Sequence, residues 1–256
     1  MSFVTSADGT RIAVETSGQG PRVVFVVGAF NDRGTGAELA RALAPRFEVV
    51  RYDRRGRGDS GDRPPYAVER EIEDLAAVIG DRAASVLGFS SGAILALRAA
   101  DAGVQIARLA LYDLPLRVDG PPGPDHATRL QGLVEEGRRG DAVEWFQREL
   151  VGLPADRVEA LRSAPFRQAL EGMAHTLVYD ARLVGHGLLP EAAGSAVQVP
   201  TLVAAGGAAP PFMARTAAVL AARLVSAKAA ILEGATHDLV PEQLGPALVR
   251  FFGGPA

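Results

Sequence analysis

The sequence predicts an α/β fold built on a mainly parallel, doubly wound sheet. Short apolar segments of roughly 4–7 residues recur along the chain, and their composition suits strands that are covered on both faces. They alternate with stretches in which apolar residues recur at helical spacing. Such alternation is typical of a parallel sheet with helices on both faces, and 256 residues are enough for one such domain with a lid.

The strands are expected in two groups. Asp8-Gly9 is a hairpin turn signal, so segments 3–5 and 11–16 should open the chain as antiparallel strands. The core strands follow as mostly apolar segments, each ending at a glycine or a polar residue. These segments are 22–27, 47–52, 84–89, 109–112, 201–205 and 229–232.

Helices are expected between these strands and at the end of the chain. Segment 68–79 shows the pattern best, because Ile72, Leu75 and Ile79 fall on one helical face. The predicted helices of the core are 37–43, 68–79, 91–100 and 243–252.

The alternation stops between residues 114 and 196. A Pro/Gly cluster at 120–124 is typical of a linker, and helical spacing follows it without a convincing strand. The predicted helices here are 128–136, 141–150, 156–161 and 166–178. One crossover normally needs a single helix, so we predict a helical lid (114–196) inserted between the sixth and seventh strands. Ordinary crossover helices are the alternative, and residues 1–113 and 197–256 would form the core.

Composition and charge narrow the choice of partners. The formal net charge of −3 disfavours nucleic acid or an anionic membrane surface as the main partner. The absence of cysteine excludes disulfides, a thiolate nucleophile and cysteine-based metal sites. Residues 1–13 lack the pattern of a signal peptide, and no apolar run approaches the ~20 residues that span a bilayer. We therefore expect a cytoplasmic monomer or homodimer that acts on a small molecule.

Ser90 is the candidate nucleophile, at the centre of the segment 88–92, Gly-Phe-Ser-Ser-Gly. A predicted strand ends at Ser90 and a predicted helix begins at once, so the chain must reverse within about two residues. The flanking glycines leave room for this turn, which would present the Ser90 hydroxyl at the carboxyl edge of the sheet. Ser91 is the alternative nucleophile, but it stands where its backbone N–H would meet an oxyanion.

A serine hydroxyl needs a general base, and four histidines are available. His237 follows the last predicted strand, so it should lie at the same edge of the sheet as Ser90. His126, His175 and His186 fall in the predicted lid, where packing or surface roles are expected, with substrate contact as the alternative for His175.

With these residues in view, the chain resembles the α/β-hydrolase superfamily over nearly its whole length. The order of serine first and histidine near the carboxyl terminus is the order of that superfamily. Segment 52–60 reads Tyr-Asp-Arg-Arg-Gly-Arg-Gly-Asp-Ser, similar to the Asp-x-Arg-Gly-x-Gly-x-Ser loop of capped members. The resemblance implies a structural loop whose arginines are available to pair with Asp53. A phosphate cradle is the alternative, but no Lys-Ser/Thr pair follows.

The resemblance also implies where the oxyanion hole lies. In the superfamily, His-Gly usually follows the first core strand, and the next residue donates the second oxyanion N–H. Here Val27 replaces the histidine, while Gly28 and Ala29 remain. The backbone N–H groups of Ala29 and Ser91 are therefore the expected donors.

The acid that would orient His237 is displaced relative to the usual pattern. Its usual loop, after the strand 201–205, reads Gly-Gly-Ala-Ala-Pro-Pro and holds no carboxylate. Some members place the acid one strand earlier, and that position here is Asp113. A turn cap or an ion pair with the lid is the alternative role of Asp113. Asp238 adjoins His237, but adjacent side chains rarely face each other.

We expect a serine hydrolase that cleaves an ester, thioester or lactone through an acyl-enzyme on Ser90. Candidates to line a largely apolar substrate pocket, or else to form the core of the lid, are Trp145, Phe146, Met173, His175 and Tyr179. No residue spacing suggests a metal or a nucleotide, so no cofactor is expected. The alternatives are a non-hydrolytic member of the fold, such as a cyclase, lyase or cofactor-free peroxidase, and a small-molecule receptor with little turnover.

Overall fold

The computed structural model describes residues 1–82 and 84–254. Within these residues, eight strands form one sheet in the order β1-β2-β4-β3-β5-β6-β7-β8. The β1–β2 and β2–β4 pairs are antiparallel, and all later neighbours are parallel. The strands are β1 (Ser2–Thr5), β2 (Arg11–Ser17), β3 (Arg22–Val26), β4 (Glu48–Tyr52), β5 (Ala84–Phe89), β6 (Ile106–Tyr112), β7 (Thr201–Gly206) and β8 (Ala227–Leu232). The predicted fold class, including the antiparallel opening hairpin, is confirmed.

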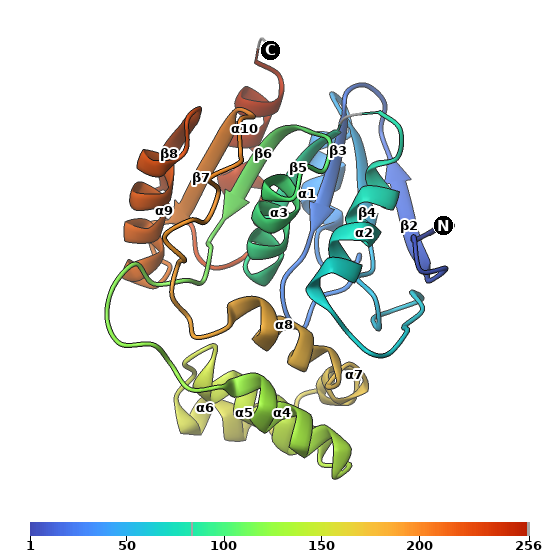
Figure 1. Cartoon of the computed structure of the whole chain (residues 1–256), viewed down its shortest axis with the longest axis vertical. Helices are drawn as coiled ribbons and strands as arrows, with labels where there is room; N and C mark the ends of the chain where they lie inside the picture. The colour runs from blue at the N-terminus through green and yellow to red at the C-terminus, as the bar shows by residue number, and fades with distance from the viewer. Residues whose placement is uncertain (83, 255–256) are drawn as a thin grey trace.

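Helices cover both faces of this sheet (Figure 1). They are α1 (Ala37–Leu43), α2 (Val68–Ile79), α3 (Ser91–Asp101), α9 (Pro211–Arg223) and α10 (Pro241–Phe252). Side chains alternate along each strand, so Val24 lies on the face covered by α2, α3 and α9, while Phe25 lies on the face covered by α1 and α10. A helix that was not predicted from the sequence is α9, which is alanine-rich and has proline in its first turn. Among the described residues, no helix is long and apolar enough to cross a membrane.

Residues 114–196 connect β6 to β7 and carry the remaining helices. These are α4 (His126–Glu135), α5 (Arg139–Glu149), α6 (Ala155–Ala160), the 3₁₀ helix η1 (Leu161–Ser163), α7 (Arg167–Gly172) and α8 (Thr176–Val184). They gather at one end of the sheet, with α8 between the sheet and the other helices (Figure 1). The predicted single helix 166–178 is wrong, because the chain turns at Met173 and divides it into α7 and α8.

The segment 114–196 has its own apolar core, which includes Leu133, Val143 and Leu177. Ala29 and Phe30, from the loop after β3, pack against this core. The helical segment therefore rests directly on the loop that the sequence analysis assigned to the oxyanion hole.

The glycine-rich loop after β4 is held by ion pairs, though not by the ones expected. Asp53 is paired by Arg33, which lies outside the loop, and it also accepts the Asp59 N–H at 2.9 Å. The arginines of the loop are buried and reach other carboxylates. They pair as Arg54 with Glu71 and Asp180, Arg55 with Asp74 and Asp8, and Arg57 with Asp180.

Candidate active site

Ser90 occupies a tight turn between β5 and α3. Its φ of 56° lies in the left-handed region, and its N–H donates to the Tyr112 carbonyl at 3.0 Å. A Cβ atom on Gly92 would lie 2.2 Å from the Val26 carbonyl oxygen, and one on Gly88 would lie 2.6 Å from the Ala93 Cα. Both flanking positions therefore require glycine, and the sharp turn that the sequence predicted is present.

Residues with strained backbone conformations lie close to this turn. Among the described residues, Phe30, Ser90 and Asp113 are the non-glycine residues with positive φ, at 61°, 56° and 52°. They follow β3, β5 and β6, which are parallel neighbours in the sheet, so the three residues lie at the carboxyl edge of the sheet. A strained non-glycine backbone costs about 1–3 kcal/mol and persists where surrounding structure enforces it, commonly at functional sites. The cluster marks this edge as the candidate active site.

Ser90, His237 and Asp113 form a hydrogen-bonded chain at that edge. The His237 Nε2 lies 3.2 Å from the Ser90 Oγ, and its Nδ1 lies 2.9 Å from the Asp113 Oδ2. Asp113 is fully buried and accepts the Gly206 N–H at 2.8 Å on its other oxygen. With the proton on Nδ1 donated to Asp113, the Nε2 is free to accept the Ser90 hydroxyl proton.

In the described structure, Asp238 forms no hydrogen bond with His237. Its carboxylate is exposed and accepts the Thr236 hydroxyl at 2.9 Å. The Phe89 ring packs beside the His237 ring, with 4.8 Å between the two ring centroids.

The loop that carries Ala29 lies against the Ser90 turn. A Cβ atom on Gly28 would lie 2.7 Å from the Ser90 Cβ, so glycine is needed for this approach. The Gly28 carbonyl accepts from Arg57 at 2.5 Å, and the Ala29 carbonyl accepts from the Asn31 side chain at 2.5 Å. Ser91 is the first residue of α3. The two expected oxyanion donors are thus in segments that flank Ser90 directly.

Gly28→Ala is expected to lower kcat/KM at least about 10-fold and to cost about 1–3 kcal/mol of unfolding free energy. The added methyl group must push the Ala29 loop and the Ser90 turn apart. Chemical denaturation measures the change in stability, and steady-state kinetics measure the change in activity.

The matched control is Gly132→Ala in α4, where the new Cβ would have no atom of the described structure within 4 Å apart from its own helix backbone and chain neighbours. There alanine should stabilise the helix by roughly 0.5–1 kcal/mol and leave activity unchanged. Equal activity in the two variants would contradict the close packing of Gly28 on Ser90.

A buried charged cluster, which the sequence analysis missed, lies beside these loops. Asp180 of α8 is fully buried and accepts from Arg54 at 2.8 Å, from Arg57 at 2.6 Å and from the Ser91 hydroxyl at 2.7 Å. Burial by itself raises the pKa of Asp180, but the charges of Arg57 and Arg54 outweigh it and hold the pKa below its ordinary value. The signal in the sequence was a carboxylate in the middle of the mostly apolar helix α8.

Two of the predicted pocket residues lie in the core of the helical segment. Phe146 is buried, and its ring meets Phe30 edge to face at 5.2 Å, beside Ala29. Tyr179 stacks on Tyr66 at 3.9 Å and donates its hydroxyl to Asp62 at 2.7 Å. Phe146 is thus placed near the Ser90 site, whereas the polar end of Tyr179 is engaged elsewhere.

The other three predicted pocket residues are half-buried. His175 lies 3.8 Å from an Asp62 oxygen and 3.3 Å from an Arg139 nitrogen, and burial lowers its pKa. Trp145 lies under the Arg129 guanidinium, which is 5.3 Å from the ring centroid. Met173 ends α7. Their role as pocket residues remains a prediction.

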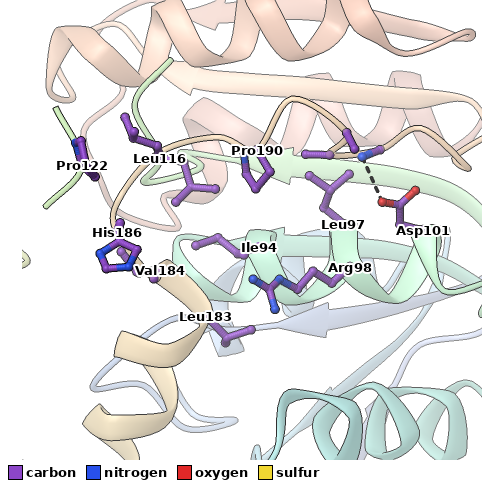
Figure 2. A pocket seen from close by; sticks show the side chains of 15 residues that line it. Ile94, Leu97, Arg98, Asp101, Leu116, Pro122, Leu183, Val184, His186 and Pro190 are labelled. Atoms are coloured by element: carbon purple, nitrogen blue, oxygen red, sulfur yellow. Dashed lines mark hydrogen bonds between the residues drawn. The ribbon is translucent and has the colours of Figure 1, made fainter. Parts of the chain in front are cut away.

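A cavity of about 580 Å³ lies between α3, α8 and the chain that returns to β7 (Figure 2). In the described part of the chain, its lining includes neither Ser90 nor His237 nor Asp113. The walls are mainly apolar, with Arg98 and Asp101 among them, and Asp101 is engaged by the Gly194 N–H (Figure 2). The cavity is therefore separate from the Ser90 site. The described residues also contain no cluster of three or more side chains suited to hold a metal ion.

Comparison with known proteins identifies the class. The model of the alpha/beta hydrolase family matches residues 23–249, so the chain belongs to that family. A solved structure of an alpha/beta hydrolase from Sphaerobacter thermophilus is 51% identical, covers 98% of this chain and 100% of its own, and superposes with a TM-score of 0.91.

Curated relatives match over shorter segments. The Burkholderia thailandensis protein "Polyketide synthase ThaQ" is 36% identical over 36% of this chain, which is 5% of its own length. The Mycobacterium tuberculosis protein "Probable oxidoreductase EphD" is 41% identical over 31% of this chain, which is 14% of its own length. The matched segments span only a small part of these longer relatives.

Proposed function

We propose that the protein is a serine hydrolase that cleaves an ester, thioester or lactone of a small, largely apolar substrate. The observation that carries this proposal is the hydrogen-bonded chain from Ser90 through His237 to the buried Asp113. A nucleophile, a base and an acid in this order are the parts that acyl transfer requires.

In the proposed first step, the Ser90 oxygen attacks the substrate carbonyl carbon while its proton moves to the His237 Nε2. Asp113 holds the imidazole in the tautomer that accepts this proton and stabilises the imidazolium that results. The carbonyl oxygen becomes an oxyanion, and the backbone N–H groups of Ala29 and Ser91 donate to it. The intermediate collapses, the bond to the leaving group breaks, and that group takes the proton from His237.

In the second step, His237 removes a proton from water, which attacks the acyl carbon bound to Ser90. The bond to Ser90 breaks, His237 returns the proton to the serine oxygen, and the carboxylic acid leaves. Segment 114–196 acts as the lid, and Phe146, which meets Phe30 beside Ala29, contributes an apolar wall on the oxyanion side.

A panel of p-nitrophenyl esters of increasing chain length, together with simple lactones, tests the proposed function. We expect enzymatic hydrolysis of at least one apolar short- or medium-chain substrate, with saturation kinetics. The absence of turnover on the whole panel by folded protein, with binding alone, would favour a receptor and contradict the proposal.

A further inference from the structure

The loop that carries Ala29 is held in place by the buried side chain of Arg57. The Arg57 guanidinium donates to the carbonyl of Gly28 at 2.5 Å and to that of Asn31 at 3.2 Å, so it spans the residues on both sides of Ala29 and Phe30. Arg57 is 2% exposed. Because Phe30 has a strained backbone with a φ of 61°, external contacts of this kind are needed to hold the turn.

Asp180 balances the charge of this arginine. It is the carboxylate within ion-pair distance of Arg57 in the described part of the chain, at 2.6 Å. Its other oxygen accepts from Arg54, whose guanidinium also reaches the Val27 carbonyl at 3.3 Å. One carboxylate from α8 thus supports two arginines that both contact the β3–α1 loop.

Asp180 also reaches the second expected oxyanion donor. The Ser91 hydroxyl donates to it at 2.7 Å, and the Ser91 side chain is buried. The contacts of Asp180 therefore converge on both segments whose backbone N–H groups would hold the oxyanion, one through Arg57 and one through Ser91.

Arg54 and Arg57 occupy the two variable positions of the Asp-x-Arg-Gly-x-Gly-x-Ser pattern that precede its second glycine, and Val27 offers no polar side chain to the loop. The arginines supply the polar support there, and Asp180 brings the countercharge from a helix 126 residues from Arg54 in the sequence.

We propose, on the basis of the hydrolase function proposed above, that Asp180 is a positioning residue that holds the Ala29 and Ser91 amides in the geometry of the oxyanion hole. The placement of α8 on the core is then a condition of catalysis as well as of folding. Without the Asp180 charge, Arg57 loses its ion pair and the strained Ala29–Phe30 turn loses its anchor.

Asp180→Asn tests this role because the amide keeps the shape of the side chain and removes its charge. We expect kcat for p-nitrophenyl ester hydrolysis to fall about 10- to 100-fold, with KM changed less than about 3-fold, since misplaced amides weaken transition-state binding alone. Backbone hydrogen exchange of residues 27–33 should rise in the same variant.

The matched control is Asp74→Asn. Asp74 is equally buried, and its hydrogen bonds in the described structure go to Arg55, away from the Ala29 loop. Asp74→Asn should lower the melting temperature by a similar amount, yet keep kcat per folded molecule within about 2-fold and leave exchange in 27–33 unchanged. If Asp180→Asn does not fold, Arg57→Lys takes its place, because lysine keeps the charge but lacks the separate Nη1, which reaches the two carbonyls, and Nη2, which reaches Asp180.

A wild-type kcat in Asp180→Asn, or an equal loss of kcat in Asp74→Asn, would overturn the positioning role while leaving the hydrolase function intact. Failure of the hydrolase function itself would show separately, as absence of turnover in the wild-type protein. In that case the exchange of residues 27–33 still reports whether Asp180 holds the loop, and unchanged exchange would overturn the role.

Discussion

Ser90→Ala is expected to lower kcat/KM for ester hydrolysis by about 10⁴-fold or more. The substitution removes the only atom that would bond to the acyl group, and the Ser90 Oγ already lies 3.2 Å from the His237 Nε2. Stability should change little, because the strained φ of 56° is imposed by the turn and alanine is no bulkier than serine. Steady-state kinetics and a thermal melt measure both effects.

Ser91→Ala is the informative comparison, because the two serines are neighbours. The Ser91 hydroxyl is directed to Asp180, away from His237, so its loss should leave at least about a tenth of the wild-type kcat. A collapse of activity in Ser91→Ala with activity retained in Ser90→Ala would show that the nucleophile has been assigned to the wrong residue.

Asp113→Asn is expected to lower kcat by about 10²- to 10⁴-fold. An amide in place of the carboxylate can present its NH₂ to the His237 Nδ1, which favours the tautomer with the proton on Nε2 and blocks proton transfer from Ser90. The loss should appear in kcat and in kcat/KM alike, because Asp113 acts on the base rather than on the bound substrate.

Asp238→Asn serves as the control for the acid. Its carboxylate is exposed and bonded to the Thr236 hydroxyl, so kcat should stay within about 2-fold of the wild type. Full activity in Asp113→Asn together with a collapse in Asp238→Asn would contradict the assignment of the acid.

The elements around Ser90 could be predicted because their signals are local. An apolar strand, two glycines and an alanine-rich helix stand next to one another in the chain, and the structure has β5 and α3 where they were expected. The inner core strands were predictable for the same reason, since strands covered on both faces read as continuous apolar runs, whereas β8 lies at the end of the sheet and is partly exposed. The shift of the acid to Asp113 could also be proposed, because a carboxylate at the end of a strand is conspicuous when the usual loop holds none.

Other features depend on packing between distant segments. Helical spacing alone does not report the turn that divides 166–178 into the largely exposed α7 and the buried α8. The partners of Arg54, Arg55 and Arg57 could not be predicted, because any carboxylate that the fold brings near would satisfy them. The helix α9 was missed even though its first-turn proline and its alanines are helix signals.

The most direct test of the central claim is covalent capture of the nucleophile. The protein is treated with a fluorophosphonate, and the modified residue is located by tandem mass spectrometry, with Ser90→Ala and His237→Ala treated in parallel. We expect one adduct, on Ser90, that is absent from Ser90→Ala and forms far more slowly in His237→Ala. An adduct on another residue, or none on the folded wild-type protein, would contradict Ser90 as the activated nucleophile.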